Sequence, residues 1–149
     1  MSETLSQEAV RQELRAVLKS HGLRATALRL ASLQVLHEHA GPMTQEQVLA
    51  ALPEGVFDPA SLWRSLAELS DKGMLRRMDL GDRVWRYELV DACRSISPDH
   101  AHFLCDDCGV VRCLPPVRLV ARQGGLPELL QGAQLKLRVS GRCALCAAA

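Results

Sequence analysis

Two Cys-x-x-Cys pairs in the last third of the chain constrain its fold more than any other feature. Cys105 and Cys108 form the first pair, and Cys143 and Cys146 form the second. Each pair can bring two thiolates to one ion from a tight turn, and two such turns complete a tetrahedral site. Because four cysteines leave no open position for a substrate, we predict a structural zinc site with about one ion per chain. The alternatives are a rubredoxin-like iron site and a redox dithiol, but the thioredoxin-like pattern that usually surrounds such a dithiol is absent.

The distribution of the cysteines also divides the chain. All six lie at or after Cys93, whereas the preceding residues are rich in leucine, arginine and helix-capping side chains. We therefore expect a first domain over residues 1–90, a hinge over 91–99 and a second domain over 100–149. Serines and a proline in the segment before residue 100 favour the hinge.

Charge and hydropathy exclude several classes of function. The start of the chain is polar, and no apolar run approaches the roughly 20 residues of a membrane span, so we expect a cytoplasmic protein with no membrane partner. In that reducing compartment six cysteines favour metal binding over disulfides. The net charge of +1 means that any DNA contact must come from a local patch. No Ser/His/Asp set, phosphate-binding loop or HExxH motif is present, so we expect neither an enzyme nor a small-molecule substrate.

The first domain has the order of a winged helix. An apolar stripe and three capping signals predict four helices, and two β-capable runs around a Gly-Asp turn predict a hairpin over residues 75–80 and 84–89. The fourth helix buries leucines and leaves Arg64 facing outward. The residues that carry these signals are Leu14, Val17, Leu18, Thr26, Thr44, Gln47, Asp58, Pro59, Leu62, Leu66, Leu69, Gly73, Gly81 and Asp82. In the second domain we expect strands over 102–104, 110–114 and 135–140, and helical turns over 116–122 and 126–130.

A second group of metal-binding residue types surrounds the hinge. His100 and His102 face the same side of an extended segment, and Cys93 lies close to them in the sequence. Asp79 or Glu88 in the hairpin could add an oxygen ligand. Such a set of sulfur, nitrogen and oxygen donors favours zinc over iron or manganese, with about one regulatory ion per chain. A surface histidine pair and a buried cysteine explain the same residues equally well.

Six motifs occur in an order and spacing that resemble one family of proteins. They occupy residues 23–29, 43–47, 60–66, 86–89, 100–109 and 141–146. The chain resembles the ferric uptake regulator (Fur) family of bacterial metal-dependent repressors, and it is most similar to the zinc uptake regulator (Zur) branch. The resemblance covers most of the chain, from about residue 23 to residue 146.

This resemblance implies a fold, a function and a set of site residues. The implied fold class is α+β, with an N-terminal winged-helix DNA-binding domain and a small α/β dimerisation domain stapled by the four-cysteine zinc. The implied function is a zinc-responsive repressor of zinc uptake genes, a homodimer that binds palindromic operator DNA. The implied sensory ligands are Asp79, Cys93, His100 and His102, and the implied DNA-binding residues are Arg24, Ser61, Trp63 and Arg64.

Departures from the family pattern leave alternatives open. Cys113 holds a position where the family usually has a glutamate ligand, so Cys113 or Glu88 could replace Asp79. Pro42 stands where iron-sensing and peroxide-sensing members often have a histidine, which counts against those functions. The alternatives are a family member that senses iron, nickel or manganese, a zinc-stapled winged-helix module without a metal response, and a thiol redox sensor that uses Cys93 and Cys113.

Overall fold

The computed structural model describes residues 2–39, 41–90, 101–118, 120, 122–125, 127–133 and 137–148. The chain divides into two compact units, unit 1 (Met1–Arg94) and unit 2 (Ser95–Ala149). The predicted hinge over residues 91–99 lies outside the described residues. Within the described helices, none combines the length and the apolar character that a membrane crossing requires.

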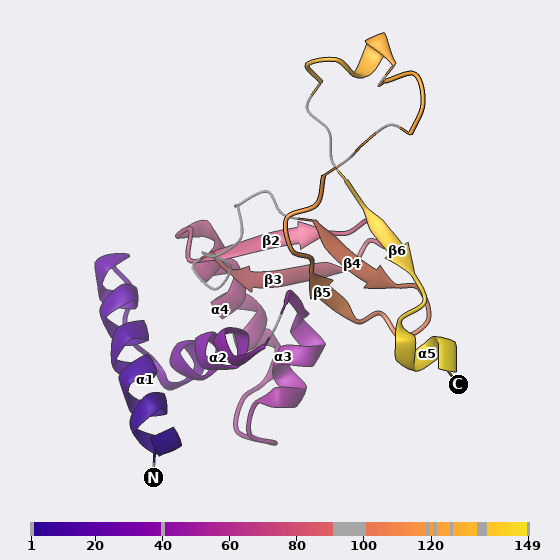
Figure 1. Ribbon diagram of the computed structural model, residues 1–149. Coiled ribbons are helices and arrows are strands. Elements are labelled where there is room, and N and C mark those ends of the chain that lie inside the picture. Colours follow the sequence, from indigo (N-terminus) through magenta and orange to yellow (C-terminus); the bar gives the residue numbers. More distant parts are fainter. Residues whose placement is uncertain are drawn as a thin grey trace. The chain divides into compact units, whose positions relative to one another are not determined.

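Unit 1 contains the four predicted helices. They are α1 (Ser2–Ser20), α2 (Ala27–Glu38), α3 (Gln45–Ala51) and α4 (Pro59–Asp71) (Figure 1). The predicted caps hold the N-termini of the last three, because Thr26, Thr44 and Asp58 each accept a backbone hydrogen bond from the residue three positions later. At Thr44 the capping box is complete, since the side chain of Gln47 accepts a hydrogen bond from the backbone of Thr44 at 2.9 Å. The capping residues thus predicted where these helices begin.

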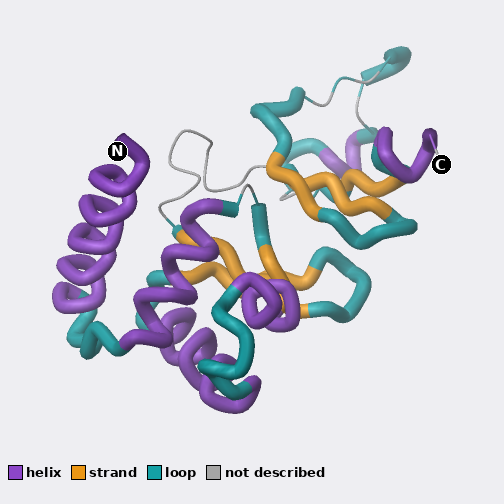
Figure 2. The backbone as a smooth tube through the Cα atoms, turned by 90° about the horizontal axis from the view of Figure 1, so that it is seen from below, coloured by secondary structure: helices purple, strands orange, loops and turns teal. Residues whose placement is uncertain are grey.

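The predicted hairpin follows the helices. Strands β2 (Leu75–Asp79) and β3 (Trp85–Leu89) pair antiparallel, with Asp79 opposite Trp85. A strand that sequence reasoning missed, β1 (Met43–Thr44), pairs with the other edge of β3. Two residues are too short to leave an alternating pattern, so no sequence signal marks β1. Figure 2 shows the helices (purple) packed against these strands (orange), which completes the winged helix.

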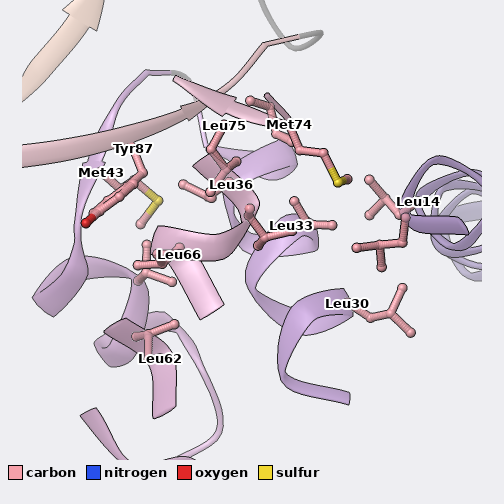
Figure 3. Packing of buried hydrophobic residues seen from close by; sticks show 14 of the residues in the cluster. Leu14, Leu30, Leu33, Leu36, Met43, Leu62, Leu66, Met74, Leu75 and Tyr87 are labelled. Atoms are coloured by element: carbon pink, nitrogen blue, oxygen red, sulfur yellow. The ribbon is translucent and has the colours of Figure 1, made fainter. Parts of the chain in front are cut away.

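A leucine-rich core joins these elements. Leu33 and Leu36 of α2 lie with Leu66 of α4 beneath the hairpin residues Leu75 and Tyr87 (Figure 3). The three leucines predicted for the buried face of α4, Leu62, Leu66 and Leu69, are completely buried. Their burial fixes the rotation of α4 about its axis, so that Arg64 faces solvent, as predicted, and so does Trp63.

Unit 2 contains a three-stranded sheet and little helix. Its central strand is β4 (His102–Cys105), which pairs antiparallel with β5 (Val111–Cys113) and parallel with β6 (Val139–Gly141) (Figure 1). A 3₁₀ turn, η1 (Glu128–Leu130), and a C-terminal helix, α5 (Ala144–Ala148), complete the described elements.

Two expectations for unit 2 need correction. The strand expected over residues 135–140 is present only in its last part, as β6, and residues 134–136 lie outside the described residues. The helical turn expected over 116–122 is absent from the described residues of that segment. The described side chains of this segment are exposed, so no buried face stabilises a helix there.

Candidate metal centre and DNA-binding residues

The four predicted zinc ligands lie together in unit 2. Cys105 ends β4, Cys108 lies in the following turn, Cys143 follows β6 and Cys146 lies in α5. The parallel pairing of Cys105 with Gly141 brings the two Cys-x-x-Cys turns side by side. All four sulfur atoms lie within 4.8 Å of one another. The cluster is therefore closed by the sheet register, not by the sequence spacing alone.

The geometry of this cluster fits a tetrahedral zinc ion. The sulfur atoms of Cys108 and Cys143 are 3.9 Å apart. A tetrahedron with Zn–S bonds of about 2.3 Å has edges of about 3.8 Å, so these two atoms already have the required separation. The backbone N–H of Cys143 donates to the sulfur of Cys105 at 3.3 Å, a contact that favours the thiolate needed for metal binding.

The protonation of the cluster is uneven. The pKa of Cys105 is lowered to about 6, first because the backbone N–H of Cys108 donates to it and then because that of Cys143 does. The pKa of Cys146 is raised to about 12, because hydrogen bonds with Cys143 and then Cys108 favour its thiol form. A metal ion must displace the remaining protons, so its binding weakens as the pH falls.

An ion pair that sequence reasoning missed joins the two turns around the cluster. Arg142 donates from Nε to the carboxylate of Asp107 at 2.5 Å and from Nη2 to the carbonyl of Cys146 at 3.1 Å. Asp107 lies between the cysteines of the first pair, and Arg142 immediately precedes the second pair. Each of these two opposite charges is next to a predicted ligand in the sequence, which was the available signal for the ion pair. The guanidinium thus links both turns around the cluster.

A second, smaller group of ligand atoms lies on the sheet of unit 2. His102 in β4 is the cross-strand partner of Cys113 in β5. Their ligand atoms lie within 4.8 Å of each other. The other two predicted sensory ligands of this region, Cys93 and His100, lie outside the described residues. The structure therefore adds Cys113 as a neighbour of His102.

The two hairpin carboxylates considered as ligands differ in their surroundings. Asp79 is exposed, and its carboxylate accepts hydrogen bonds from the backbone of Gly81 at 2.7 Å and of Arg83 at 3.1 Å. It thus supports the hairpin turn and holds Arg83 at a φ of 62°, which is unusual for a residue other than glycine. Glu88 is only 4% exposed and lies opposite Arg76. Both remain predicted ligands.

The predicted DNA-binding residues lie on the surface of unit 1. Ser61, Trp63 and Arg64 occupy the first half of α4, and Trp63 is 56% exposed. Arg64 donates to the hydroxyl of Ser61 at 3.3 Å. Asp58 caps this end of the helix, and hydrogen bonds from Ser61 hold the pKa of Asp58 below its usual value. Arg24 is exposed in the loop between α1 and α2.

The hairpin carries further arginines with defined contacts. The Arg77 guanidinium stacks on Trp85, 3.7 Å from the centre of the ring. These residues are diagonal neighbours across β2 and β3, which is the arrangement that the strand register produces. Arg86 is buried and binds both carboxylate oxygens of Asp82, at 2.9 and 2.8 Å. Arg86 also holds the pKa of Asp82 below its usual value.

A winged helix with exposed arginines and a unit with a four-thiolate cluster together define a metal-binding winged-helix protein. Comparison with known proteins narrows this class to a family. The profile of the Ferric uptake regulator family matches residues 20–124, which is more than half of the chain. The chain belongs to this family, and the family prediction from sequence is confirmed.

Individual relatives agree with this assignment. The chain is 31% identical over 98 residues to Ferric uptake regulation protein 1 of Mycolicibacterium fortuitum, and this match covers 64% of the chain and 56% of that protein. The ferric uptake regulator of Helicobacter pylori has a TM-score of 0.62 at 18% identity, over 95% of this chain and 93% of that one. A zinc uptake regulator solved with zinc and DNA has a TM-score of 0.57 at 19% identity, over 95% of both chains. At these identities the two structures show a shared fold.

Proposed function

We propose that this protein is a zinc-responsive transcriptional repressor that controls zinc uptake genes. In this proposal a homodimer binds a palindromic operator when a sensory site is loaded with zinc. Its family consists of regulators, and the chain is one of them rather than an enzyme. The observation that carries the choice of metal is the pairing of Cys113 with His102, because it puts a thiolate and an imidazole side by side outside the four-cysteine cluster.

The chemistry of this pair supports zinc. Thiolates are soft ligands that suit zinc, whereas manganese and magnesium prefer oxygen donors. Zinc, when bound, would supply a tetrahedral cross-link between sulfur, nitrogen and oxygen ligands. We propose that His102 and Cys113 hold it together with Cys93 and His100, and that a hairpin carboxylate, Asp79 or Glu88, acts as a further or substitute ligand.

The surface of α4 supports DNA binding. A recognition helix enters the major groove with its N-terminal residues toward the bases, which is where Ser61, Trp63 and Arg64 lie. Arg64 suits the O6 and N7 atoms of guanine, and Trp63 offers an apolar surface to a thymine methyl group. Arg24 would add a contact outside the major groove. Because the net charge is only +1, the affinity depends on where these few arginines lie.

The coupling between zinc and DNA is a testable part of this proposal. If loading of the sensory site favours DNA binding, DNA must strengthen zinc binding by the same factor. We expect a coupling of about tenfold to a hundredfold, which is within the range typical of allosteric coupling. A zinc affinity that operator DNA leaves unchanged would contradict the mechanism.

The first experiment measures metal content and DNA binding together. The purified full-length protein, dialysed against buffered zinc, should contain about two zinc ions per chain and lose about one of them to a moderate chelator. The same loss should abolish binding to a palindromic duplex selected by the protein from a randomised pool. Fe²⁺ and Mn²⁺ should not restore binding. If one of them restores it and zinc does not, the choice of metal is wrong.

Cysteine variants separate the two sites. Cys113→Ser and Cys93→Ser should each retain one tightly bound zinc and a folded chain but lose zinc-dependent DNA binding. Cys143→Ser should lose the tightly bound ion. If Cys113→Ser keeps both ions and the full response, Cys113 is not a sensory ligand. If all three variants behave alike, separate structural and sensory sites do not exist.

A further inference from the structure

One arginine in unit 1 contacts two elements that carry predicted DNA-binding residues. Arg29 lies in the first turn of α2, and its side chain is only 16% exposed. Its Nη1 donates to the backbone carbonyl of Arg24 at 2.8 Å. Its Nη2 donates to the carboxylate of Glu68 on α4. A single guanidinium therefore joins the loop before α2 to the predicted recognition helix.

The contact with the loop fixes the backbone at Arg24. The same carbonyl also accepts a hydrogen bond from the backbone N–H of Thr26 at 2.9 Å. On the other side of Arg24, the side chain of Leu23 is buried in the core. The backbone is thus held on both sides of Arg24, while the Arg24 side chain stays exposed.

The contact with α4 changes the surroundings of Arg64. Glu68 lies four residues after Arg64, a spacing at which opposite charges on a helix are neighbours and can pair. Instead Glu68 contacts Arg29, and Arg64 donates toward the N-terminus of the helix, to Ser61. Arg29 thereby neutralises a half-exposed carboxylate beside the predicted DNA-binding surface.

We propose that Arg29 is a positioning residue for DNA binding. It holds the Arg24 loop in a fixed position on α4 and keeps Glu68 away from Arg64, so that Arg24 and Arg64 contact the same DNA. This inference rests on the proposed DNA-binding function. It assigns no direct DNA contact to Arg29, because its two terminal nitrogens already donate within the protein.

Two substitutions of Glu68 distinguish positioning from simple charge effects. In zinc-loaded full-length protein, Glu68→Ala should weaken binding to the selected palindromic duplex about tenfold, because Arg29 loses its anchor on α4. Glu68→Gln keeps an acceptor for Arg29 and should bind within about threefold of the wild type. If the negative charge of Glu68 alone matters, both variants bind DNA more tightly, and the proposal fails.

A second set of variants tests whether Arg29 acts through Arg24. Arg29→Lys keeps the charge but cannot form the two-pronged contact, so its affinity should be about tenfold weaker. The slope of log affinity against log salt should decrease by about 0.9 for each phosphate that the variant no longer binds. Arg24→Ala should do the same. Because Arg29→Lys keeps a cation beside Glu68, the double variant should be no weaker than Arg24→Ala alone. Additive effects of the two substitutions would show that Arg29 does not act through Arg24.

Two controls distinguish a loss of folding, a failure of the proposed DNA-binding function and a failure of the positioning role alone. Urea unfolding of each variant shows whether unit 1 remains folded, and a loss of DNA binding counts only at an unchanged unfolding midpoint. If the wild type itself does not distinguish the selected duplex from an unrelated one, the proposed function fails. If the wild type does, and Arg29→Lys matches its affinity and salt slope, only the positioning role is wrong.

Discussion

The two units of this protein are stabilised in different ways. Among its described residues, unit 1 has a continuous core of sixteen buried side chains, most of them leucines. Among the described residues of unit 2, the buried apolar side chains are Ala101, Leu104, Cys105 and Val111. One of these four is itself a predicted metal ligand. Among the described residues, the apolar core of unit 2 is therefore small and includes one of its cysteines, whereas the core of unit 1 extends over four helices and a hairpin.

This difference follows from size and composition. A short segment cannot bury enough apolar surface to offset its conformational entropy, and small domains commonly add a metal site or disulfides. In such domains the free energy of metal binding is part of the free energy of folding. We therefore expect unit 1 to fold without metal, whereas unit 2 should require it.

The largest effect should come from breaking the four-cysteine cluster. Cys143→Ser removes one of four thiolates, so we expect unit 2 to lose its fold while unit 1 retains its helices. Limited proteolysis and NMR spectra of the full-length protein would locate the unfolded region. Cys113→Ser, which removes a cysteine outside the cluster, is the matched control. Loss of structure in unit 1 as well would contradict the comparison.

A core substitution in unit 1 should destabilise unit 1 and leave the metal in unit 2. Leu66→Ala leaves a cavity at a completely buried position and should lower the free energy of unfolding of unit 1 by about 2 to 5 kcal/mol. Urea unfolding followed by tryptophan fluorescence reports on this unit, because both tryptophans of the chain, Trp63 and Trp85, lie in it. The tightly bound metal should remain. Release of that metal by Leu66→Ala would show that the units do not fold separately.

A smaller effect is expected on the rate at which unit 2 releases its metal. Arg142→Ala removes the ion pair with Asp107 and the hydrogen bond to Cys146, so the four thiolates are held less rigidly. We expect metal release to a chelator to be about tenfold faster, with the metal content unchanged. Arg138→Ala, at an exposed arginine for which no role is proposed, serves as the control. Equal release rates in Arg142→Ala and the wild type would remove Arg142 from the metal site.

The smallest effect concerns acid stability of the hairpin. Arg86 holds the pKa of Asp82 below its ordinary value of 3.8. A lowered pKa in the folded state stabilises the fold above that ordinary value, and the stabilisation is lost as the pH falls through the lowered pKa. Asp82→Asn should therefore be less stable than the wild type at neutral pH, and the difference should disappear in acid. A difference that stays constant with pH would mean that the charge of Asp82 is not responsible.

Much of unit 1 could be predicted because its signals are local. Thr26, Thr44 and Asp58 begin their helices through hydrogen bonds to residues three positions away, so neighbouring residues carry the information. The buried leucines of α4 follow from helical spacing alone. Strand β1 and the Arg77–Trp85 stack could not be predicted in this way, because each depends on how strands from different parts of the chain align.

For the metal sites, too, local features could be predicted and contacts between strands could not. The two Cys-x-x-Cys pairs predicted four ligands, because each pair supplies two of them from a single turn. The position of Cys113 beside His102 depends on the pairing of β4 with β5, and no spacing rule gives that register. The helix expected over residues 116–122 is absent from the described residues of that segment, whose side chains are exposed and have no core to pack against.

The sequence by itself determined where three helices of unit 1 begin, the inward face of α4 and which four cysteines form the cluster. Each of these depends on interactions within a few residues, or on a pattern whose period the backbone geometry fixes. The tertiary structure alone decided that Arg29 contacts both Arg24 and Glu68, that Arg142 joins the two cysteine turns, and that Cys113 lies beside His102. Apart from the contact between Arg29 and Arg24, these contacts join residues from different elements, and their geometry exists only after the core and the strand register have formed.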